Sequence, residues 1–377
     1  MRVLIITNGM GEDAMGAALA KALAPQCEME ALPTVGEGLA YRNICPLVGP
    51  RGHLASEGHR KQGSLIKDFQ HGLALTALKH VRYMRQQRGR WDKIIVLGDM
   101  VGLALCKAGG HAVDLYLDCY KSGFASTYSA VEKRLIKATA AKTLCRDDIL
   151  AGQLRAYGLD AGFVGNIMMD TVPELAMDVT PLVGDKTAVT LLPGSRNAAK
   201  VLFELQIRAL GRLTGKYPIS VLVPVAPTAD ANQLIRVSGL RAVDKEPDLT
   251  APEYLAKAEM VDKTPVHFFD KGVGSLARVS RFVAGQAGTA GFQSAGLGVP
   301  VIALVPPDAR PSRVAKNERL MGESRITTSL DVNELTAAMA SLLEDEADAK
   351  RRGHIGMERI GPAGALDYAV RLILAGG

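Results

Sequence analysis

Short, strongly apolar runs alternate along the chain with longer stretches in which apolar residues recur every three or four positions. The short runs are typical of buried strands, and the longer stretches are typical of amphipathic helices. The pattern predicts strands at Val3–Ile6, Ile94–Leu97, Asp114–Leu117, Lys142–Leu144, Ala188–Leu192, Ser220–Val225, Val266–Phe269, Phe282–Ala284 and Val299–Val305. Between them it predicts helices such as Ala14–Leu23, Ala199–Leu213 and Val332–Leu343.

This alternation predicts an α/β fold, with parallel sheets that helices cover on both faces. The pattern starts at Val3 and again at Ala188, after the Pro- and Asp-containing stretch Thr171–Asp185, where we place a linker. The length of 377 residues also exceeds what one hydrophobic core usually supports. We therefore expect two doubly wound domains, with ligands bound at the carboxyl ends of their strands.

Composition narrows the class of protein. Apolar residues make up 47% of the chain and charged residues 22%, as in ordinary globular proteins. No apolar run approaches the roughly 18 residues of a membrane-spanning helix, and the apolar start is too short for a signal peptide. The cysteines are odd in number and form no C-x-x-C pair, which predicts reduced thiols and a cytoplasmic location: Cys27, Cys45, Cys106, Cys119 and Cys145.

The net charge of +6 is concentrated in one segment. Between Arg51 and Arg90, nine Lys and Arg residues stand against two acids, a net charge of +7 (9 − 2), so the rest of the chain is nearly neutral. Helical spacing predicts an amphipathic helix within Ser64–Arg90, with the apolar residues Ile66, Phe69, Leu73, Ala77, Val81 and Met84 and the basic residues Lys79, Arg82, Arg85 and Arg88. Such a helix can lie on an anionic membrane, and the alternative is a core-packed helix with a solvated basic face. Aromatic residues are too few for a nucleic-acid partner.

Carboxylates follow two of the predicted strands in the amino-terminal half. After the first strand, a glycine-rich turn leads to Glu12 and Asp13 at the start of the next helix. These acids either cap that helix or line a site, and their charge would repel the pyrophosphate of a dinucleotide. Asp99 follows the strand Ile94–Leu97, and it likewise either caps the next helix or points into a cleft between the domains.

Two loops in the carboxy-terminal half are suited to anions. Pro193–Asn197 and Gly288–Gln293 each follow a predicted strand and start a helix, where free backbone amides attract negative charge. Arg196 can bind phosphate oxygens bidentately, although the Gly-Lys-Ser/Thr of a Walker loop is absent. Two such helix starts suit a diphosphate held without a metal, and a close-packed turn is the other explanation of the glycines. No set of ligands has zinc spacing, so no metal site is expected.

A series of short motifs runs along nearly the whole chain: Gly11-Glu12-Asp13, Leu32–Gly38 with Ala40-Tyr41, Val48-Gly49-Pro50, Cys145–Asp148, Gly165-Asn166 with Met168–Asp170, Leu191–Arg196, Gly288-Thr289-Ala290, Gly296–Gly298 with Pro300, and Arg359 with Gly361–Gly364. With these motifs the chain resembles the lipid-A-disaccharide synthases, which are glycosyltransferases of the GT-B architecture and of glycosyltransferase family 19. It resembles the lipid-A-disaccharide-synthase-related proteins more closely still.

The resemblance implies a GT-B architecture, in which two doubly wound Rossmann-like domains face each other across a cleft. Residues 1–172 would form the acceptor-side domain, 173–355 the nucleotide-sugar domain, and 356–377 a helix that packs back on the first domain. The donor, a uridine-diphosphate sugar, would be held by Gly194, Ser195, Arg196, Gly288, Thr289, Ala290 and Gln293. The acceptor side would be lined by Glu12, Asp13 and Asp99.

We therefore expect a glycosyltransferase that moves a sugar from a nucleotide-diphosphate sugar to a lipid or lipid-linked acceptor at the inner face of the membrane. A carboxylate would act as the general base, with Asp99 preferred, Glu12 next and Asp13 also a candidate. Met10 stands where the related proteins usually have a histidine, so a histidine base is not expected. The alternatives are a sugar-nucleotide 2-epimerase or hydrolase of the same fold, and a non-catalytic protein that binds a sugar nucleotide or a lipid. No cofactor is expected besides the donor substrate.

Overall fold

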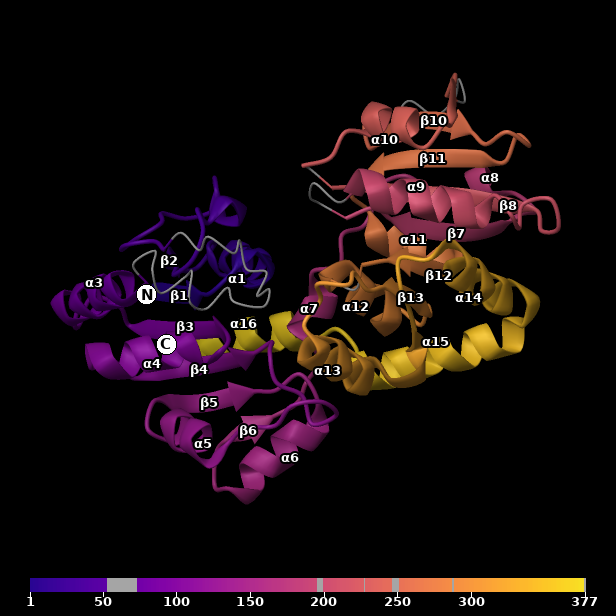
Figure 1. Ribbon diagram of the computed structural model, residues 1–377. Coiled ribbons are helices and arrows are strands. Elements are labelled where there is room, and N and C mark those ends of the chain that lie inside the picture. Colours follow the sequence, from indigo (N-terminus) through magenta and orange to yellow (C-terminus); the bar gives the residue numbers. More distant parts are fainter. Residues whose placement is uncertain (53–72, 195–198, 227, 246–250, 287, 376–377) are drawn as a thin grey trace. The chain divides into compact units, whose positions relative to one another are not determined.

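The computed structural model describes residues 1–52, 73–194, 199–226, 228–245, 251–286 and 288–375 (Figure 1). Its contacts divide the chain into two compact units. The first unit comprises Met1–Thr171, Arg310–Lys316 and Gly361–Gly377, and the second comprises Val172–Ala309 and Asn317–Ile360. Each unit is an α/β domain built around its own sheet, so the predicted fold class is confirmed.

The described strands of the first unit form a parallel sheet in the order β2-β1-β3-β4-β5-β6. Leu4 and Ile6 of β1 enter one apolar core, and Val3 and Ile5 are fully buried on the opposite face. The sheet is therefore buried on both faces, as parallel sheets are. Its strands are β1 (Arg2–Thr7), β2 (Glu28–Pro33), β3 (Lys93–Gly98), β4 (Val113–Asp118), β5 (Ala140–Leu144) and β6 (Ala161–Gly162).

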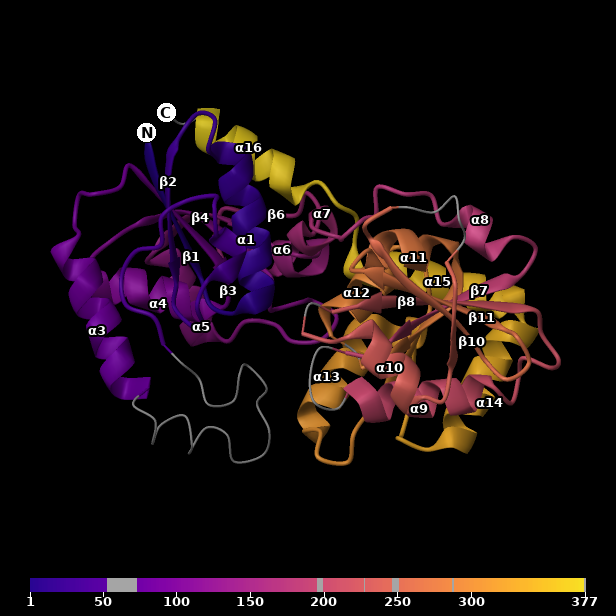
Figure 2. The same ribbon diagram turned by 90° about the horizontal axis from the view of Figure 1, so that it is seen from above.

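The helices of this unit follow the strands in a regular alternation. The carboxy-terminal helix α16 lies beside α1, and Asp170 accepts hydrogen bonds from the amides of Gly364 (2.7 Å) and Leu366 (3.1 Å) where that helix starts (Figure 2). The elements are α1 (Met10–Leu23), the 3-10 turn η1 (Leu39–Tyr41), α3 (Leu73–Gln86), α4 (Met100–Gly109), α5 (Ala130–Lys137), α6 (Asp148–Ala156), α7 (Ile167–Asp170) and α16 (Ala365–Ala375).

In the second unit the described strands are ordered β14-β13-β12-β7-β8-β11-β10-β9. Val189 and Leu191 of β7 pack in one core with Phe203 of the helix α9, whereas Ala188 packs in another with Leu182 of α8. The strands are β7 (Thr187–Leu192), β8 (Ile219–Val225), β9 (Arg241–Val243), β10 (Tyr254–Glu259), β11 (Pro265–Asp270), β12 (Ser280–Gly285), β13 (Val301–Leu304) and β14 (Arg325–Thr328).

Helices cover both faces of this second sheet, as its two separate cores require. The helices are α8 (Thr180–Val183), α9 (Ala199–Leu210), α10 (Ala231–Val237), α11 (Val273–Val279), α12 (Thr289–Gly296), the 3-10 turn η2 (Gly322–Ser324), α14 (Val332–Glu344) and α15 (Glu346–Ile360). The helix α13 (Pro311–Met321) starts in the first unit, which includes Arg310–Lys316, and ends in the second.

Every predicted strand overlaps an observed one, and the predicted parallel sheets are confirmed, except that β10 pairs antiparallel with both β11 and β9 in the second sheet. The chain passes from the first unit to the second between Thr171 and Val172, at the start of the predicted linker Thr171–Asp185. Within that stretch Val179, Leu182 and Val183 are buried in a core of the second unit, so it belongs to that unit and is more than a connection.

The helix α3 buries only part of the apolar stripe that was expected. Met84 is buried in the core of the first unit and Val81 packs against that core, whereas Ala77 is exposed. His80, which is outside the expected stripe, is also buried. Ile66 and Phe69 of the expected stripe lie outside the described residues. Met84 is fully buried because it packs against Gly109 at the end of α4, where an added Cβ would lie 2.6 Å from the Cβ of Met84.

A close helix contact in the second unit gives a test of the packing. A Cβ at Gly353 of α15 would overlap the backbone carbonyl of Gly298, which cannot move aside as a side chain can. Gly353→Ala should therefore lower the free energy of unfolding by about 1–3 kcal/mol and lower the melting temperature. Gly152→Ala in α6 is the matched control, because only the tip of Arg155 lies near (3.8 Å) and alanine favours the helix by about 1 kcal/mol. Equal melting temperatures for the two variants would contradict this account.

Candidate functional site

The first sheet changes direction between β1 and β3, since β2 lies on one side of β1 and β4 to β6 follow on the other. Such a point is where doubly wound sheets bind ligands. Asn8 follows β1 and Asp99 follows β3, and the Asn8 Nδ2 donates to Asp99 Oδ2 at 2.9 Å. Thr34, which follows β2, donates from Oγ1 to Asn8 Oδ1 at 2.7 Å. Polar side chains thus join three neighbouring strand ends.

Asp99 is fixed at both of its carboxylate oxygens. Its Oδ1 accepts from the backbone amide of Val101 at 2.9 Å, so Asp99 is the N-cap of α4. Its Oδ2 accepts the amide of Asn8. The residue is also half-buried rather than enclosed. Of the two alternatives that the sequence leaves open for Asp99, the structure shows the helix cap, at the carboxyl edge of the sheet.

Glu12 lies over the backbone at the ends of β1 and β3. An added Cβ at Gly98 would lie 2.9 Å from Glu12 Cγ, and one at Gly9 would lie 2.8 Å from Glu12 Oε2. Gly98 has a φ of +122°, which side chains rarely adopt, so the position requires glycine for two reasons. The carboxyl group of Glu12 is consequently held against protein rather than in open water.

This environment raises the pKa of Glu12 from 4.5 to about 7. Burial is the main cause, and the negative charges of Asp99 and Asp13 add to it, against the opposing effect of a backbone amide. Burial also raises the pKa of Asp13 to about 6, although the Thr7 hydroxyl, which donates at 2.5 Å, opposes the rise. The Tyr41 hydroxyl donates to Thr7 at 3.2 Å and fixes that chain of contacts. A carboxyl with a pKa near 7 can both take up and release a proton at neutral pH.

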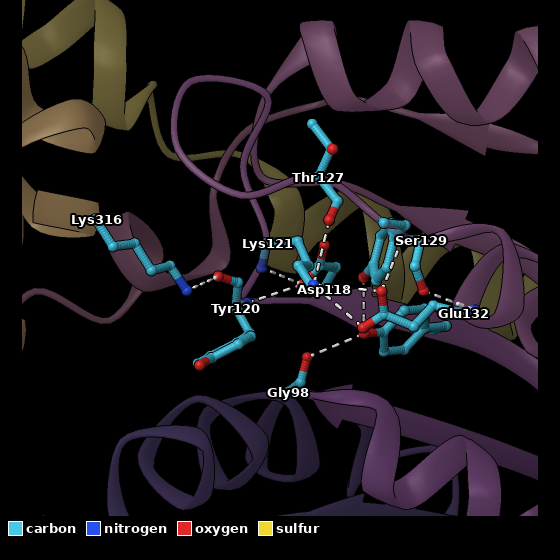
Figure 3. A network of polar contacts seen from close by, with 10 residues as sticks. Gly98, Asp118, Tyr120, Lys121, Thr127, Ser129, Glu132 and Lys316 are labelled. Carbon is cyan, nitrogen blue, oxygen red and sulfur yellow. Dashed lines mark hydrogen bonds and ion pairs between the residues drawn. The ribbon is translucent and has the colours of Figure 1, made fainter. Parts of the chain in front are cut away.

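Asp118 belongs to this edge of the sheet, and the sequence analysis missed it. It ends β4, is 3% exposed, and accepts hydrogen bonds from the amides of Tyr120 (2.8 Å) and Lys121 (3.0 Å), as Figure 3 shows. Burial raises its pKa to about 6. Asp118 follows a predicted strand just as Asp99 does, so the same signal was present. It was overlooked because no glycine marks the turn.

A pair of buried tyrosines holds Gly98 from the side of β4. The Tyr116 hydroxyl donates to the Gly98 carbonyl at 3.2 Å and lies 2.9 Å from the Tyr128 hydroxyl. The amide of Cys119 also points at the Gly98 carbonyl, at 3.4 Å. The backbone of Gly98, against which Glu12 packs, is therefore held by hydrogen bonds from β4 and from the residue after it.

Basic residues surround the turn that follows β4. Arg146 donates from Nη1 to the Cys119 carbonyl at 3.3 Å, and Lys316 donates to the Tyr120 carbonyl at 3.2 Å. The Lys316 ammonium also lies 3.6 Å from the centre of the Tyr120 ring. Burial, followed by the charges of Arg146 and Lys121, lowers the pKa of Lys316 to about 8. These contacts fix the turn that holds Asp118.

The second sheet changes direction between β7 and β12. The Nε2 of buried Gln206 donates to the carbonyls of Leu192 (3.3 Å) and Ala284 (2.9 Å), the ends of these two strands. A Cβ at Gly285 would lie 2.5 Å from the Leu192 carbonyl oxygen, so the strands approach each other too closely for any other residue. The two loops predicted to hold a donor leave the sheet from this junction.

The predicted donor residues differ in whether the structure describes them and in how exposed they are. Gly194 follows β7 with a left-handed φ of +92°, and Ser195 and Arg196 lie outside the described residues. Gly288 is the N-cap of α12, and Thr289 and Ala290 are the first residues of that helix. No side chain at the cap forms a hydrogen bond to the backbone amides of the first turn. Gln293 is only 4% exposed, so it lies inside the unit rather than at the helix start.

The three predicted acids Glu12, Asp13 and Asp99 lie in one region of the first unit, where the charges of Asp99 and Asp13 act on Glu12. Their role in a site stays a prediction. The predicted donor residues that are described belong to the second unit. Among the described residues, no group of three or more His, Cys, Asp or Glu side chains is arranged to hold a metal ion.

Comparisons with known proteins support the fold. No protein-family model matches the chain, and no curated protein matches it. Acinetobacter baumannii MurG superposes with a TM-score of 0.60 at 15% identity, covering 99% of each chain. A UDP-GlcNAc 2-epimerase from Neisseria meningitidis bound to UDP-GlcNAc gives 0.55 at 13% identity, covering 100% of each. The spinosyn rhamnosyltransferase SpnG, complexed with thymidine diphosphate, gives 0.59 at 15%, covering 98% of this chain and 100% of SpnG. The chain thus has a GT-B-like fold of two Rossmann-like domains.

The raised pKa of Glu12 makes a prediction for stability. Between about pH 4.5 and 7 the folded chain retains a proton that the unfolded chain has lost, so the free energy of unfolding falls as pH rises through this range. Glu12→Gln removes that contribution. Its melting temperature should fall less between pH 4.5 and 7.5 than that of the wild type, with a residual slope from Asp13 and Asp118. Parallel melting curves for the two proteins across this range would show that Glu12 is not desolvated.

Proposed function

We propose that the protein is a glycosyltransferase of the kind that the lipid-A-disaccharide-synthase-related proteins represent. It would move a sugar from a nucleotide-diphosphate sugar, with uridine as the nucleoside, to a lipid or lipid-linked acceptor. The observation that carries the proposal is the half-buried carboxyl of Glu12, with a pKa of about 7, beside Asp99 at the switch point of the first sheet. The fold is one that sugar-nucleotide enzymes share.

The geometry changes the order of the candidate bases. A general base works best when its pKa is near the operating pH, and Glu12 meets that condition. Both oxygens of Asp99 are already occupied by the amides of Val101 and Asn8. We therefore assign proton removal from the acceptor hydroxyl to Glu12. Asp99 would raise the pKa of Glu12 through its charge, and Asp13 would remain a buried structural neighbour.

The leaving group would be stabilised in the second unit. As the sugar–phosphate bond breaks, negative charge grows on the diphosphate, and positioned donors stabilise such charge most when they are fixed in advance. The exposed start of α12 at Gly288 and Thr289 offers backbone amides, and the dipole of that helix favours an anion. Arg196 and Ser195, on the loop after Gly194, would complete the site.

A sugar-nucleotide 2-epimerase or hydrolase is the second candidate. The observation that favours it is the similarity of the fold to a UDP-GlcNAc 2-epimerase over the full length of both chains. An epimerase or hydrolase would consume the nucleotide sugar without any acceptor, whereas a transferase requires one. Donor binding without turnover on any acceptor would instead indicate a binding protein that has no catalytic base.

A membrane-surface acceptor is supported by the exposed face of α3. Leu75 and Leu78 are each 66% exposed, and Lys79 and Arg82 are exposed on the same helix. A helix with apolar and basic residues together on its outer face can bind anionic lipid at the cytoplasmic surface. None of the helices in the described ranges has the length and apolar content to pass through a bilayer.

The assignment of the base predicts different pH profiles for two variants. Glu12→Gln should lower turnover by about 10²–10⁴-fold and leave donor affinity, measured by calorimetry, unchanged. Asp99→Asn should cost less and should move the acidic limb of the pH–rate profile to lower pH, because the charge that raises the pKa of Glu12 is removed. Wild-type turnover in Glu12→Gln, or an unmoved limb in Asp99→Asn, would contradict the assignment.

The membrane proposal predicts a loss of vesicle binding in two separate ways. Replacing Lys79 and Arg82 with Gln should weaken binding to anionic vesicles by about 2 kcal/mol in total, and high salt should weaken the wild type similarly. Replacing Leu75 and Leu78 with Ser should weaken binding at any salt concentration, because it removes exposed apolar area.

Sedimentation with anionic and neutral vesicles measures both effects. The control replaces Arg134 and Lys137 with Gln, since these are exposed basic residues of another helix, α5. Equal losses in the control and the α3 variants would mean that only net charge matters. Binding to neither vesicle type by the wild type would remove the membrane proposal.

A further inference from the structure

The amine of Lys316 has no part in the proposed reaction, yet its surroundings differ from those of an ordinary surface lysine. Lys316 lies in α13 and is half-buried. Its ammonium group donates to the Tyr120 carbonyl at 3.2 Å (Figure 3). The same nitrogen lies 3.6 Å from the centre of the Tyr120 ring. The nitrogen is therefore held at a fixed place by uncharged partners, on the turn that follows β4.

Three positive charges act on this amine. Arg313 precedes Lys316 by three positions on the same helix, so the two lie on one face of it. Arg146 follows β5, and Lys121 follows β4. Arg146 has the largest effect of the three, and it is itself only 7% exposed, with an Nη2 that has no hydrogen-bond partner in the described ranges. Like charges at close range favour the neutral form of an amine.

Acidic residues of the same region offset these charges only in part. Glu132 forms an ion pair with Lys121 at 3.1 Å, and both Asp118 and Asp147 attract Arg146. Asp118 also acts on the amine directly and favours its charged form. That effect is smaller than the effect of burial and than the effects of the charges of Arg146 and Lys121. The balance of the cluster therefore lies against the ammonium ion.

These influences lower the pKa of Lys316 from 10.5 to about 8, with burial as the main cause. At pH 8 about half of the amine is then neutral, compared with roughly 0.4% of an ordinary lysine. A neutral amine has a free lone pair, and lysines beside other cations are the ones that act as nucleophiles. Lys216 is the opposite case, because the hydrogen bond that it donates to Glu344 raises its pKa.

The positive charges of the cluster also select the electrophile. They attract an anion and repel a cation, and Arg313 is exposed where a small anion can approach. An acyl phosphate combines negative charge with a carbonyl carbon and a good leaving group. The amine nitrogen would attack that carbon and form the C–N bond, while the C–O bond to phosphorus breaks. Inorganic phosphate leaves with the electron pair, and the proton of the nitrogen passes to water.

We propose that Lys316 is a modification site that takes an acyl group from small acyl phosphates. The product is a neutral amide, so the cluster loses one of its positive charges. Because the interaction between Lys316 and Asp118 is mutual, the loss of that charge raises the pKa of Asp118. Acylation would thus alter the electrostatics of the turn after β4. This inference concerns the reaction of Lys316 itself and does not depend on the proposed glycosyltransferase function.

Treatment of the full chain with acetyl phosphate, followed by peptide mass spectrometry over time, tests the proposal. Lys137, an exposed lysine at the end of α5, serves as the internal reference. At pH 8 Lys316 should be acetylated about tenfold faster than Lys137, because its larger neutral fraction outweighs its lower basicity. Its rate should level off above about pH 8, whereas that of Lys137 should continue to rise. Equal rates at pH 8, or a rate at Lys316 that still rises at pH 10, would overturn the proposal.

A variant of the cluster tests the physical cause. Arg313→Gln removes one positive charge from an exposed position, so it should slow the acetylation of Lys316 at pH 8 by about two- to threefold. Arg134→Gln, at an exposed position of α5, is the matched control and should react like the wild type. Circular dichroism melts of both variants check that folding is retained. An unchanged rate in Arg313→Gln, or the same loss in the control, would contradict the role of the cluster.

A neutral reagent tests the class of electrophile. Acetic anhydride transfers the same acetyl group without a negative charge, so it should prefer Lys316 over Lys137 less strongly than acetyl phosphate does. High salt should reduce the preference of acetyl phosphate toward that of the anhydride. The same preference with both reagents would overturn the anionic electrophile. Since none of these measurements uses a nucleotide sugar, a failure of the proposed transferase activity leaves their outcome unaffected.

Discussion

The close approach of Glu12 to the backbone at Gly98 is the constraint on which the first unit depends. A carboxyl group can lie there only because Gly9 and Gly98 have no side chains, and Gly98 keeps its left-handed conformation because Tyr116 holds its carbonyl. Desolvation follows from this packing, and the pKa of about 7 follows from desolvation. The chemistry of the site is thus a consequence of backbone geometry. Tyr116 and Tyr128, which are buried behind the site, take part in setting it.

The second unit also has a glycine at the switch point of its sheet, but the buried side chain there is neutral rather than acidic. Its switch point is also closed by a glycine, Gly285, against the neighbouring strand, and a buried side chain, Gln206, links the two strand ends. There the buried group is a neutral amide, and the nearest helix start at Gly288 has no acidic residue in its first turn. One unit therefore gathers carboxylates and the other gathers amides at the equivalent point of its sheet. These are the two kinds of group that the proposed transfer from a nucleoside diphosphate would use, as proton acceptor and as anion site.

The sequence predicted the fold well because buried parallel strands are continuous apolar runs, as in Ala188–Leu192. It missed β2, β6, β9, β10 and β14, whose residues do not form such runs. In β2, Glu30 interrupts the pattern, and its charge is tolerated because Arg90 and the Trp91 indole donate to its carboxylate. The acids of the site were predicted from their place after strands. What the sequence could not give is the order of the bases, because that depends on burial and on which oxygens are already occupied.

The charge of the segment Arg51–Arg90 illustrates the same limit. Counting residues assigns all of its basic side chains to a surface, but Arg85 and Arg88 donate to the carbonyls of Ala108 and Gly109, where α4 ends. These two arginines satisfy helix carbonyls and complement the helix dipole, so they stabilise the fold at the same time. Among the described residues of α3, Lys79 and Arg82 remain for a partner, and they lie on the same helix as exposed Leu75 and Leu78.

The inner face of α3 supports the segment that carries Arg51. A Cβ at Gly52 would lie 3.1 Å from Thr76 of this helix, and one at Gly49 would lie 2.9 Å from Tyr83. The helix that offers leucines and basic residues outward therefore packs, on its inner face, against the chain that follows β2. Tyr41 of that chain donates to Thr7, and Thr7 donates to Asp13, so the packing of α3 is joined through side chains to the buried carboxyl next to Glu12.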